Sequence, residues 1–126
     1  MITKLLTAAL LLTMTLAAET RVYELRTYHT LPGKLDALLT RFRDHTTRIF
    51  EKHGMENIGY WIPKDQPNTL IYIISHKNMD AAKKSWDEFR ADPVWVKVRD
   101  ASEANGKIVE KVDSVYMTPT DFSKLK

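Results

Sequence analysis

The strongest constraint on the fold is the order in which two hydrophobic repeats follow each other along the chain. Residues 21–30 alternate in the period of two that indicates a β-strand. Residues 35–53 then carry leucine, isoleucine and phenylalanine at the spacing of one amphipathic helix. Residues 56–62 and 69–76 both have strand character and are joined by a polar loop that contains proline. The first half therefore predicts strand, helix and a hairpin of two strands.

The second half completes this pattern with two helical pieces and a last strand. Asn78 is a residue type that caps helices, and Asp92 followed by Pro93 predicts that a second piece begins there. We expect that piece to end near Gly106, before a strand in residues 107–117. The order predicts an α+β protein with the ferredoxin-like βαββαβ fold. Its antiparallel sheet would have helices on one face only.

The N-terminus has the features of a secretory signal. Lys4 precedes an apolar run over residues 5–16, and Ala17 is suited to cleavage after it. The run is shorter than the roughly 20 residues that a membrane span needs. We therefore predict that residues 1–17 form a signal peptide and that the protein is exported, to the periplasm or outside the cell. A retained N-terminal anchor is the alternative.

The composition excludes several classes of protein. The first 17 residues hold one of the 19 basic residues and none of the 16 acidic ones, so the remaining chain is weakly basic. Its charges are scattered, which predicts no nucleic-acid partner and no membrane partner after signal removal. The chain has no cysteine, so it has no disulfide, thiolate nucleophile or cysteine-type zinc site.

The first strand raises the question of which sheet face the helices cover. Alternation places Tyr23 and Leu25 on one face and Glu24, Arg26 and Tyr28 on the other. We expect the apolar set to pack beneath the helices and the mixed set to lie on the opposite, open face. Two such faces packed together would enclose a cavity. The side chains predicted to line it are Glu24, Arg26, Tyr28, Trp61, Tyr72 and His76.

Four segments resemble the NIPSNAP family: "YELRTYHTLPGKLDALLTRF", "EKHGMENIGYW", "ADPVW" and "TPTDFS". The resemblance covers about residues 21–123, which we take as the single domain. It implies a dimeric α/β barrel, in which two ferredoxin-like subunits pack sheet against sheet. It implies little about chemistry, because the wider superfamily includes cofactor-independent oxygenases, isomerases, haem enzymes and stress-response domains. Related sequences carry a His and a Trp where this chain has Tyr72 and Ile74.

Glu24 and Arg26 are the main candidates for chemistry. In a ferredoxin-like sheet the first and third strands are antiparallel neighbours, which predicts that Tyr72 lies beside Arg26. The pair could be a structural ion pair. Alternatively, Arg26 could hold a carboxylate or enolate while Glu24 acts as a base or positions one.

The four histidines do not predict a metal site. His45 and His53 are eight residues apart on one helix, about 12 Å along its axis. His29 and His76 would lie at opposite ends of antiparallel strands. We expect no metal and no cofactor.

Three functions remain compatible with the sequence. The first is a homodimer that binds a small organic molecule, aromatic or acidic, in the cavity. The second is a cofactor-independent enzyme of the monooxygenase or isomerase type acting there. The third is a protein-interaction module whose cavity is filled by its own side chains.

Overall fold

The computed structural model describes residue 2, residues 8–12 and residues 21–126. The predicted signal peptide, residues 1–17, falls largely outside the described residues. Within the part of the chain that is described, no helix is long and apolar enough to cross a membrane.

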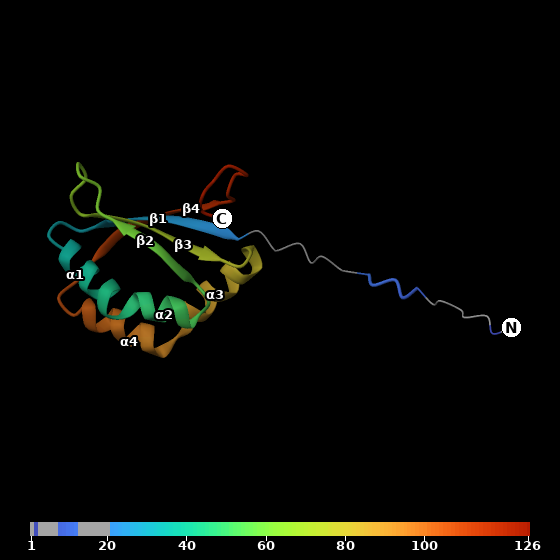
Figure 1. The fold of residues 1–126 in the computed structure, drawn as a ribbon. Helices are drawn as coiled ribbons and strands as arrows, with labels where there is room; N and C mark the ends of the chain where they lie inside the picture. Colours follow the sequence, from blue (N-terminus) through green and yellow to red (C-terminus); the bar gives the residue numbers. More distant parts are fainter. Residues whose placement is uncertain (1, 3–7, 13–20) are drawn as a thin grey trace.

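Four strands form one antiparallel sheet in the order β2-β3-β1-β4, and the helices lie on one side of it (Figure 1). The strands are β1 (Val22–Thr30), β2 (Glu56–Trp61), β3 (Thr69–His76) and β4 (Val109–Met117). The helices are α1 (Leu35–Arg41), η1 (Phe42–Thr46), α2 (Thr47–Lys52), α3 (Met79–Ala91) and α4 (Pro93–Ser102). This arrangement confirms the predicted ferredoxin-like α+β fold.

The predicted helix boundaries depend on side chains that satisfy free backbone N–H groups. The Asn78 side chain accepts the N–H of Ala81 at 2.8 Å and begins α3. The Asp92 side chain accepts the N–H of Val94 at 2.8 Å and begins α4. Gly54 ends α2 with a φ of 80°, a conformation that glycine adopts without strain. The predicted helix starts at Asn78 and Asp92 are confirmed.

Two helical details differ from the prediction. The first long helix contains a π-helical turn, η1, in which the Thr46 hydroxyl donates to the Arg41 carbonyl at 3.2 Å. A hydrophobic repeat does not reveal such a turn, since the same apolar stripe continues on both sides of it. The last helix ends at Ser102, before the predicted end near Gly106.

The core lies between the helices and the sheet and is rich in aromatic side chains. Phe50 contacts the rings of Trp86 and Phe89, with centroids 5.4 and 5.1 Å away. Phe89 also contacts Trp95 at 4.6 Å, so the partly buried Trp95 ring of α4 packs against this core. The fully or nearly buried cluster consists of Leu38, Phe42, Ile49, Phe50, Met55, Leu70, Tyr72, Ile74, Trp86, Phe89 and Ile108.

The predicted orientation of the sheet is wrong for β1 and β3 and right for Trp61 of β2, because the register of β2 shifts between Asn57 and Gly59. We call the helix-covered side the inner face and the other side the open face. Tyr72 and Ile74 belong to the core cluster, and Glu24 bonds Trp86 of α3, so the mixed set lies on the inner face. The open face carries Tyr23, Leu25, Thr27, Gly59, Trp61, Ile71, Ile73 and Val115. The prediction failed because both faces are rich in apolar residues and the inner charges neutralise one another.

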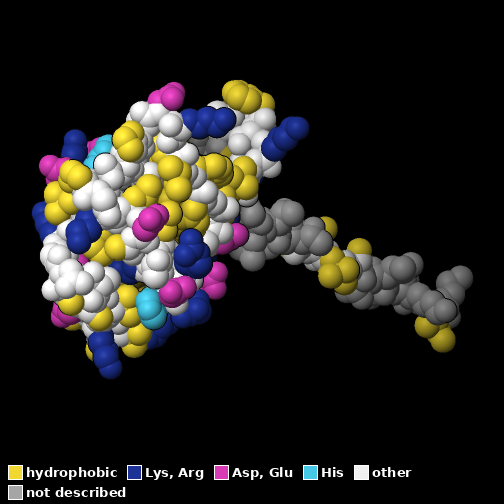
Figure 2. All heavy atoms as spheres, turned by 90° about the vertical axis from the view of Figure 1, so that its left-hand side faces the viewer, with side chains coloured by type: hydrophobic (Ala, Val, Ile, Leu, Met, Phe, Trp, Pro, Cys, Tyr) yellow, Lys and Arg dark blue, Asp and Glu magenta, His cyan; other side chains and the backbone are white. Residues whose placement is uncertain are grey.

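The charged surface agrees with the scattered pattern of the sequence. Figure 2 shows acidic and basic side chains interspersed around exposed hydrophobic ones on the side of the molecule that it displays. No extended field of one sign appears on that side.

Candidate functional site

The carboxylate of Glu24 is the centre of a buried polar network. Its Oε1 accepts hydrogen bonds from His76 Nε2 and Trp86 Nε1, both at 2.8 Å. Its Oε2 accepts hydrogen bonds from Arg26 Nη1 and Ser114 Oγ, both at 2.7 Å. Four donors from β1, β3, α3 and β4 therefore converge on one carboxylate.

This environment keeps Glu24 ionised. Burial by itself would raise the pKa of Glu24, but hydrogen bonds from His76, Ser114, Trp86 and Arg26 outweigh it and lower the pKa to about 2. A carboxylate is a poor general base at neutral pH when its pKa is this low and each of its oxygens already accepts two hydrogen bonds. Glu24 therefore serves to position its neighbours.

Every nitrogen of the Arg26 guanidinium has a hydrogen-bond partner. Besides the bond from Nη1 to Glu24, Nε donates to the Tyr72 hydroxyl at 2.9 Å, and Nη2 lies 3.4 Å from the Tyr28 hydroxyl. The guanidinium carbon stacks 4.2 Å from the centre of a Trp86 ring, which adds a cation–π contact. Its side chain is 16% exposed, so one part of it still meets solvent.

The predicted register between β1 and β3 is confirmed. Arg26 pairs with Tyr72, and Val22 pairs with His76. Tyr72 is fully buried, and its ring stacks on Tyr60 at 4.9 Å. Burial raises the pKa of Tyr72 well above its ordinary value, so its hydroxyl keeps its proton. The pairing thus places a neutral phenol against the guanidinium.

His76 lies beneath the network, away from solvent. It is fully buried, and since Glu24 is a carboxylate, Nε2 carries the proton and donates it. Its Nδ1 has no hydrogen-bond partner among the described residues. A ring in this position can hold Glu24 in place, but it does not line the pocket described below.

Trp61 does not belong to this network. It lies on the open face with 52% of its surface exposed, and its ring covers Gly59. A Cβ at Gly59 would lie 2.4 Å from the Trp61 ring, so the glycine leaves room for the ring to lie over the backbone. The structure thus brings together Glu24, Arg26, Tyr28, Tyr72 and His76, and separates Trp61 from them.

A pocket of about 370 Å³ opens beside the network, between α3 and β4. The β4 side of the pocket belongs to a strand that is exposed along most of its length. Glu24, Arg26 and Trp86 form its buried side. The rest of its wall comes from Met79, Lys83, Arg90, Ser114 and Tyr116.

The pocket has more cations than anions among its described lining residues. Arg26, Lys83 and Arg90 face one carboxylate, Glu24, whose charge is already paired. Arg90 also lies 3.0 Å from Asp87, an exposed pair that solvent screens. The site can therefore accept a small negatively charged molecule.

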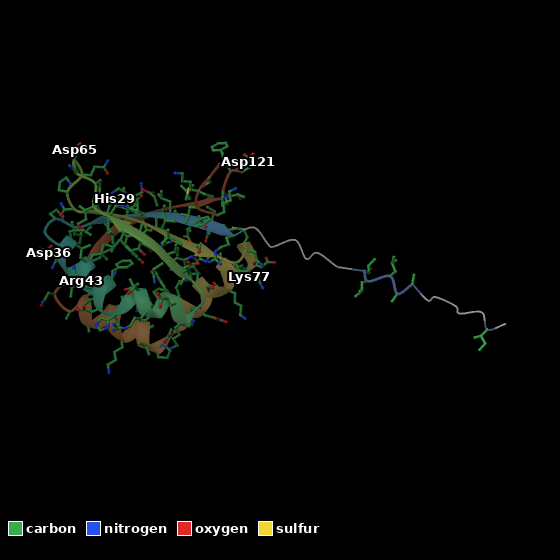
Figure 3. The ribbon with its side chains drawn as sticks, in the orientation of Figure 1. His29, Asp36, Arg43, Asp65, Lys77 and Asp121 are labelled. Carbon is green, nitrogen blue, oxygen red and sulfur yellow. The ribbon has the colours of Figure 1, made fainter. Side chains whose placement is uncertain are left out.

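The remaining histidines lie in other surroundings. His29 is at the β1 end beside the β2–β3 loop that Asp65 marks, while Lys77, next to His76, is at the opposite end of the sheet (Figure 3). His29 Nε2 lies 3.1 Å from Asp113. His53 Nε2 lies 2.7 Å from Asp92. Within residues 2, 8–12 and 21–126 no group of three potential ligands could hold a metal ion.

Sequence reasoning missed the contributions of α3 and β4. The helical spacing of Trp86 does not distinguish it from an ordinary core residue, although a buried indole N–H requires an acceptor. Ser114, Lys83 and Arg90 belong to no sequence motif that predicts a site. The signal that could have identified them is the charged pair on β1. A buried carboxylate needs several hydrogen-bond donors, and the indole N–H of Trp86 on α3 is one of them.

The comparisons with known proteins identify the family. The NIPSNAP family model matches residues 23–124, which is most of the chain and includes the whole network. The chain belongs to the NIPSNAP family. The predicted resemblance is therefore confirmed.

A curated relative and solved structures extend this result. A NipSnap homolog from Dictyostelium discoideum is 32% identical over 89 residues, 69% of this chain and 39% of that protein. The chain thus spans about two fifths of the length of that curated relative. A NIPSNAP family protein of unknown function from Agrobacterium tumefaciens is 25% identical, with a TM-score of 0.74 over 87% of this chain and 97% of its own.

A more distant structure shows the breadth of the fold. A Chloroflexus aurantiacus protein, named as a proposed antibiotic biosynthesis monooxygenase, has a TM-score of 0.56 at 9% identity. The match covers 85% of this chain and all of that one. It shows a shared fold, and fold alone does not transfer an activity.

Proposed function

We propose that this NIPSNAP family protein binds a small organic anion in the pocket between α3 and β4. The observation that carries the proposal is the charge balance there: three cations line the pocket, and its one carboxylate, Glu24, is fully used by its own partners. A ligand carboxylate near Lys83 and Arg90 would complement the excess charge. Trp86 and Tyr116 provide aromatic surface for a planar ligand.

Binding is favoured over turnover by the state of the two groups that could move a proton. Glu24 has a pKa of about 2 and accepts four hydrogen bonds. His76 is fully buried below the pocket. Neither presents a free basic atom to the pocket, so we do not advance an enzymatic role.

The open face supports a homodimer. Trp61 and Val115 are 52% and 55% exposed, and they lie on the same face as the half-buried Leu25, Ile71 and Ile73. Apolar side chains exposed to this extent usually mark an association site. A second copy is the partner we propose, since a sheet can pack face to face with another sheet. The pocket would then lie on the far side of the sheet from the interface.

Export remains our proposal for the location. It rests on the apolar run over residues 5–16 and on Ala17. Mass spectrometry of the protein recovered from the periplasm or medium should give a chain that begins at Ala18. A chain of full length, retained in the membrane fraction, would contradict it.

Ligand binding is tested with a defined probe, benzoate, and its neutral analogue benzamide. We expect benzoate to quench tryptophan fluorescence in a saturable way and benzamide to bind at least about tenfold more weakly, the effect of one charge-assisted contact. The double variant Lys83→Gln/Arg90→Gln should lose the preference for benzoate. Lys84→Gln is the matched control, because Lys84 lies on the same helix but does not line the pocket.

Two further results complete this test. Native mass spectrometry of the purified protein should give the mass of a dimer, with any small molecule that copurifies. Equal affinity for benzoate and benzamide, unchanged in the double variant, would refute the anion site. A pocket that takes up neither probe would favour the interaction module instead.

A further inference from the structure

A second cavity lies in the helical layer, away from both the sheet and the pocket described above. It is a groove of about 820 Å³ between α1–η1 and α4. Its lining consists of Ala37, Thr40, Arg41, His45, Val94, Lys97, Val98, Ala101 and Ser102. Since the helices cover the inner face, this groove would stay accessible in a dimer formed through the open face (Figure 1).

Arg41 is the unusual residue of this groove. Only 5% of it is exposed, yet its Nε has no hydrogen-bond partner among the described residues. Its Nη1 donates to Ser102 Oγ at 3.2 Å and lies 3.6 Å from a carboxylate oxygen of Glu103, which is 34% exposed. The guanidinium carbon lies 5.1 Å from the centre of the Trp95 ring. A buried cation with so loose an ion pair is incompletely compensated.

The π-helical turn contributes to the shape of the groove. Arg41 ends α1, and η1 begins at the next residue and brings His45 to the groove wall. A π turn widens the helix locally, and such turns occur often at functional sites. Here it adjoins the one buried arginine of the groove, so the irregular backbone and the incompletely paired cation coincide.

The chemistry of the lining selects the kind of ligand. Arg41, His45 and Lys97 are basic, and the described lining residues include no acidic side chain. The apolar positions are alanine and valine, and the described lining residues include no Phe, Tyr or Trp. This distinguishes it from the pocket at α3, which contains Trp86 and Tyr116. Basic groups around an aliphatic floor match a carboxylate on an alkyl chain.

We propose that this groove binds an aliphatic carboxylic acid in its anionic form. Arg41 and Lys97 pair with the carboxylate, and the alkyl chain packs along Val94, Val98 and Ala101. The site is separate from the organic-anion pocket, because the two cavities share no lining residue.

The test uses decanoate as the probe, with decanol as a neutral control of the same chain length. In an NMR titration of the 15N-labelled protein, decanoate should shift the amide signals of Lys97, Val98 and Ala101 in a saturable way. Decanol should bind at least about tenfold more weakly, since it lacks the charge-assisted contact. Benzoate should not displace decanoate.

Three variants identify the residues responsible. Lys97→Gln should weaken decanoate binding about threefold, and Arg41→Gln at least about tenfold. Arg41 is buried, so its replacement could unfold the chain. Ala101→Phe is therefore the third variant, because it fills the groove from an exposed helical position. It should remain folded, lose decanoate binding and keep benzoate binding unchanged.

Several outcomes would overturn the proposal. Equal affinity for decanol and decanoate would remove the role of Arg41 and Lys97. Undiminished decanoate binding by Ala101→Phe would place the probe elsewhere. Shifts confined to α3 and β4, with displacement by benzoate, would mean that decanoate occupies the first pocket. Loss of benzoate binding together with intact decanoate binding would refute only the function proposed above.

Discussion

The two faces of the sheet carry the opposite kinds of side chain from those that polarity suggests: charged side chains lie on the inner face and apolar ones on the open face. The inner face carries Glu24, Arg26 and His76, and the helices cover it. The open face carries Leu25, Ile73 and Trp61, and no helix covers it (Figure 1). Charge lies inside because each charged group has partners within the chain. Apolar residues lie outside where a second molecule can cover them. Side-chain polarity by itself therefore does not identify the buried face of such a sheet.

The largest effect should come from removing the centre of the inner network. Glu24→Ala leaves Arg26 without its counter-ion and His76, Trp86 and Ser114 without their acceptor. We expect a loss of about 3–5 kcal/mol in the free energy of unfolding, the usual cost of breaking a buried pair. Urea denaturation followed by circular dichroism measures it.

Glu56→Ala is the matched control for that experiment. Glu56 pairs with Arg21 at 2.6 Å, but its side chain is 58% exposed. A surface pair of this kind contributes less than about 1 kcal/mol. Equal losses in the two variants would contradict the structural role of the Glu24 network.

The second-largest effect should come from acid, which removes the contribution of Glu24 to the free energy of unfolding. The pKa of Glu24 is about 2 in the folded protein against 4.5 ordinarily, so its contribution is fully present above pH 4.5 and is lost as the pH falls through 2. The shift corresponds to about 3 kcal/mol. Denaturation curves between pH 5 and 2 should show this decline, and Glu24→Gln should flatten it.

Another carboxylate contributes to the background in that experiment. Hydrogen bonds from Lys52 and His53 lower the pKa of Asp92, so its contribution is lost over the same acidic range. Because Glu24→Gln retains Asp92, the difference between the two curves isolates Glu24. Parallel curves for the two proteins would show that Glu24 titrates normally.

On the open face, a charge should disrupt association and leave the fold intact. Val115→Lys introduces a lysine from each subunit into the proposed interface, and we expect the dissociation constant to rise at least about tenfold. Val112→Lys is the control on the same strand, since Val112 lies on the inner face and is 38% exposed. Sedimentation velocity over a concentration series distinguishes them. Identical behaviour of the two variants would place the interface elsewhere.

The smallest effect should come from Gly59→Ala. The added methyl group would meet the outer edge of the Trp61 ring, which is half exposed and can turn away. We expect the free energy of unfolding to change by less than about 1 kcal/mol. Trp61 fluorescence should change even so, because the ring leaves its place over the backbone. An unchanged spectrum would show that the ring is already mobile.

The sequence predicted the elements and register of this fold better than its faces. The caps at Asn78 and Asp92 follow from local residue chemistry, and the pairing of Arg26 with Tyr72 follows from strand order. The family follows from the resemblance of four segments. Which side of β1 the helices cover depends on donors supplied by α3 and β4, which are distant in sequence. The π turn after Arg41 could not be predicted, because the hydrophobic repeat continues through it. The groove beside that turn could not be predicted for the same reason.

The four hydrogen bonds to Glu24 also have a consequence for the folding kinetics of the chain. Its partners His76, Trp86 and Ser114 are 52, 62 and 90 residues away in sequence. Ser114 belongs to the last strand, so a chain still emerging from synthesis cannot complete the shell around this carboxylate. Folding should consequently be slow relative to helical bundles, because the closing contacts are non-local. A truncated chain that ends before β4 would leave the Glu24 carboxylate without Ser114 and exposed to water. We expect such a chain not to reach a stable fold.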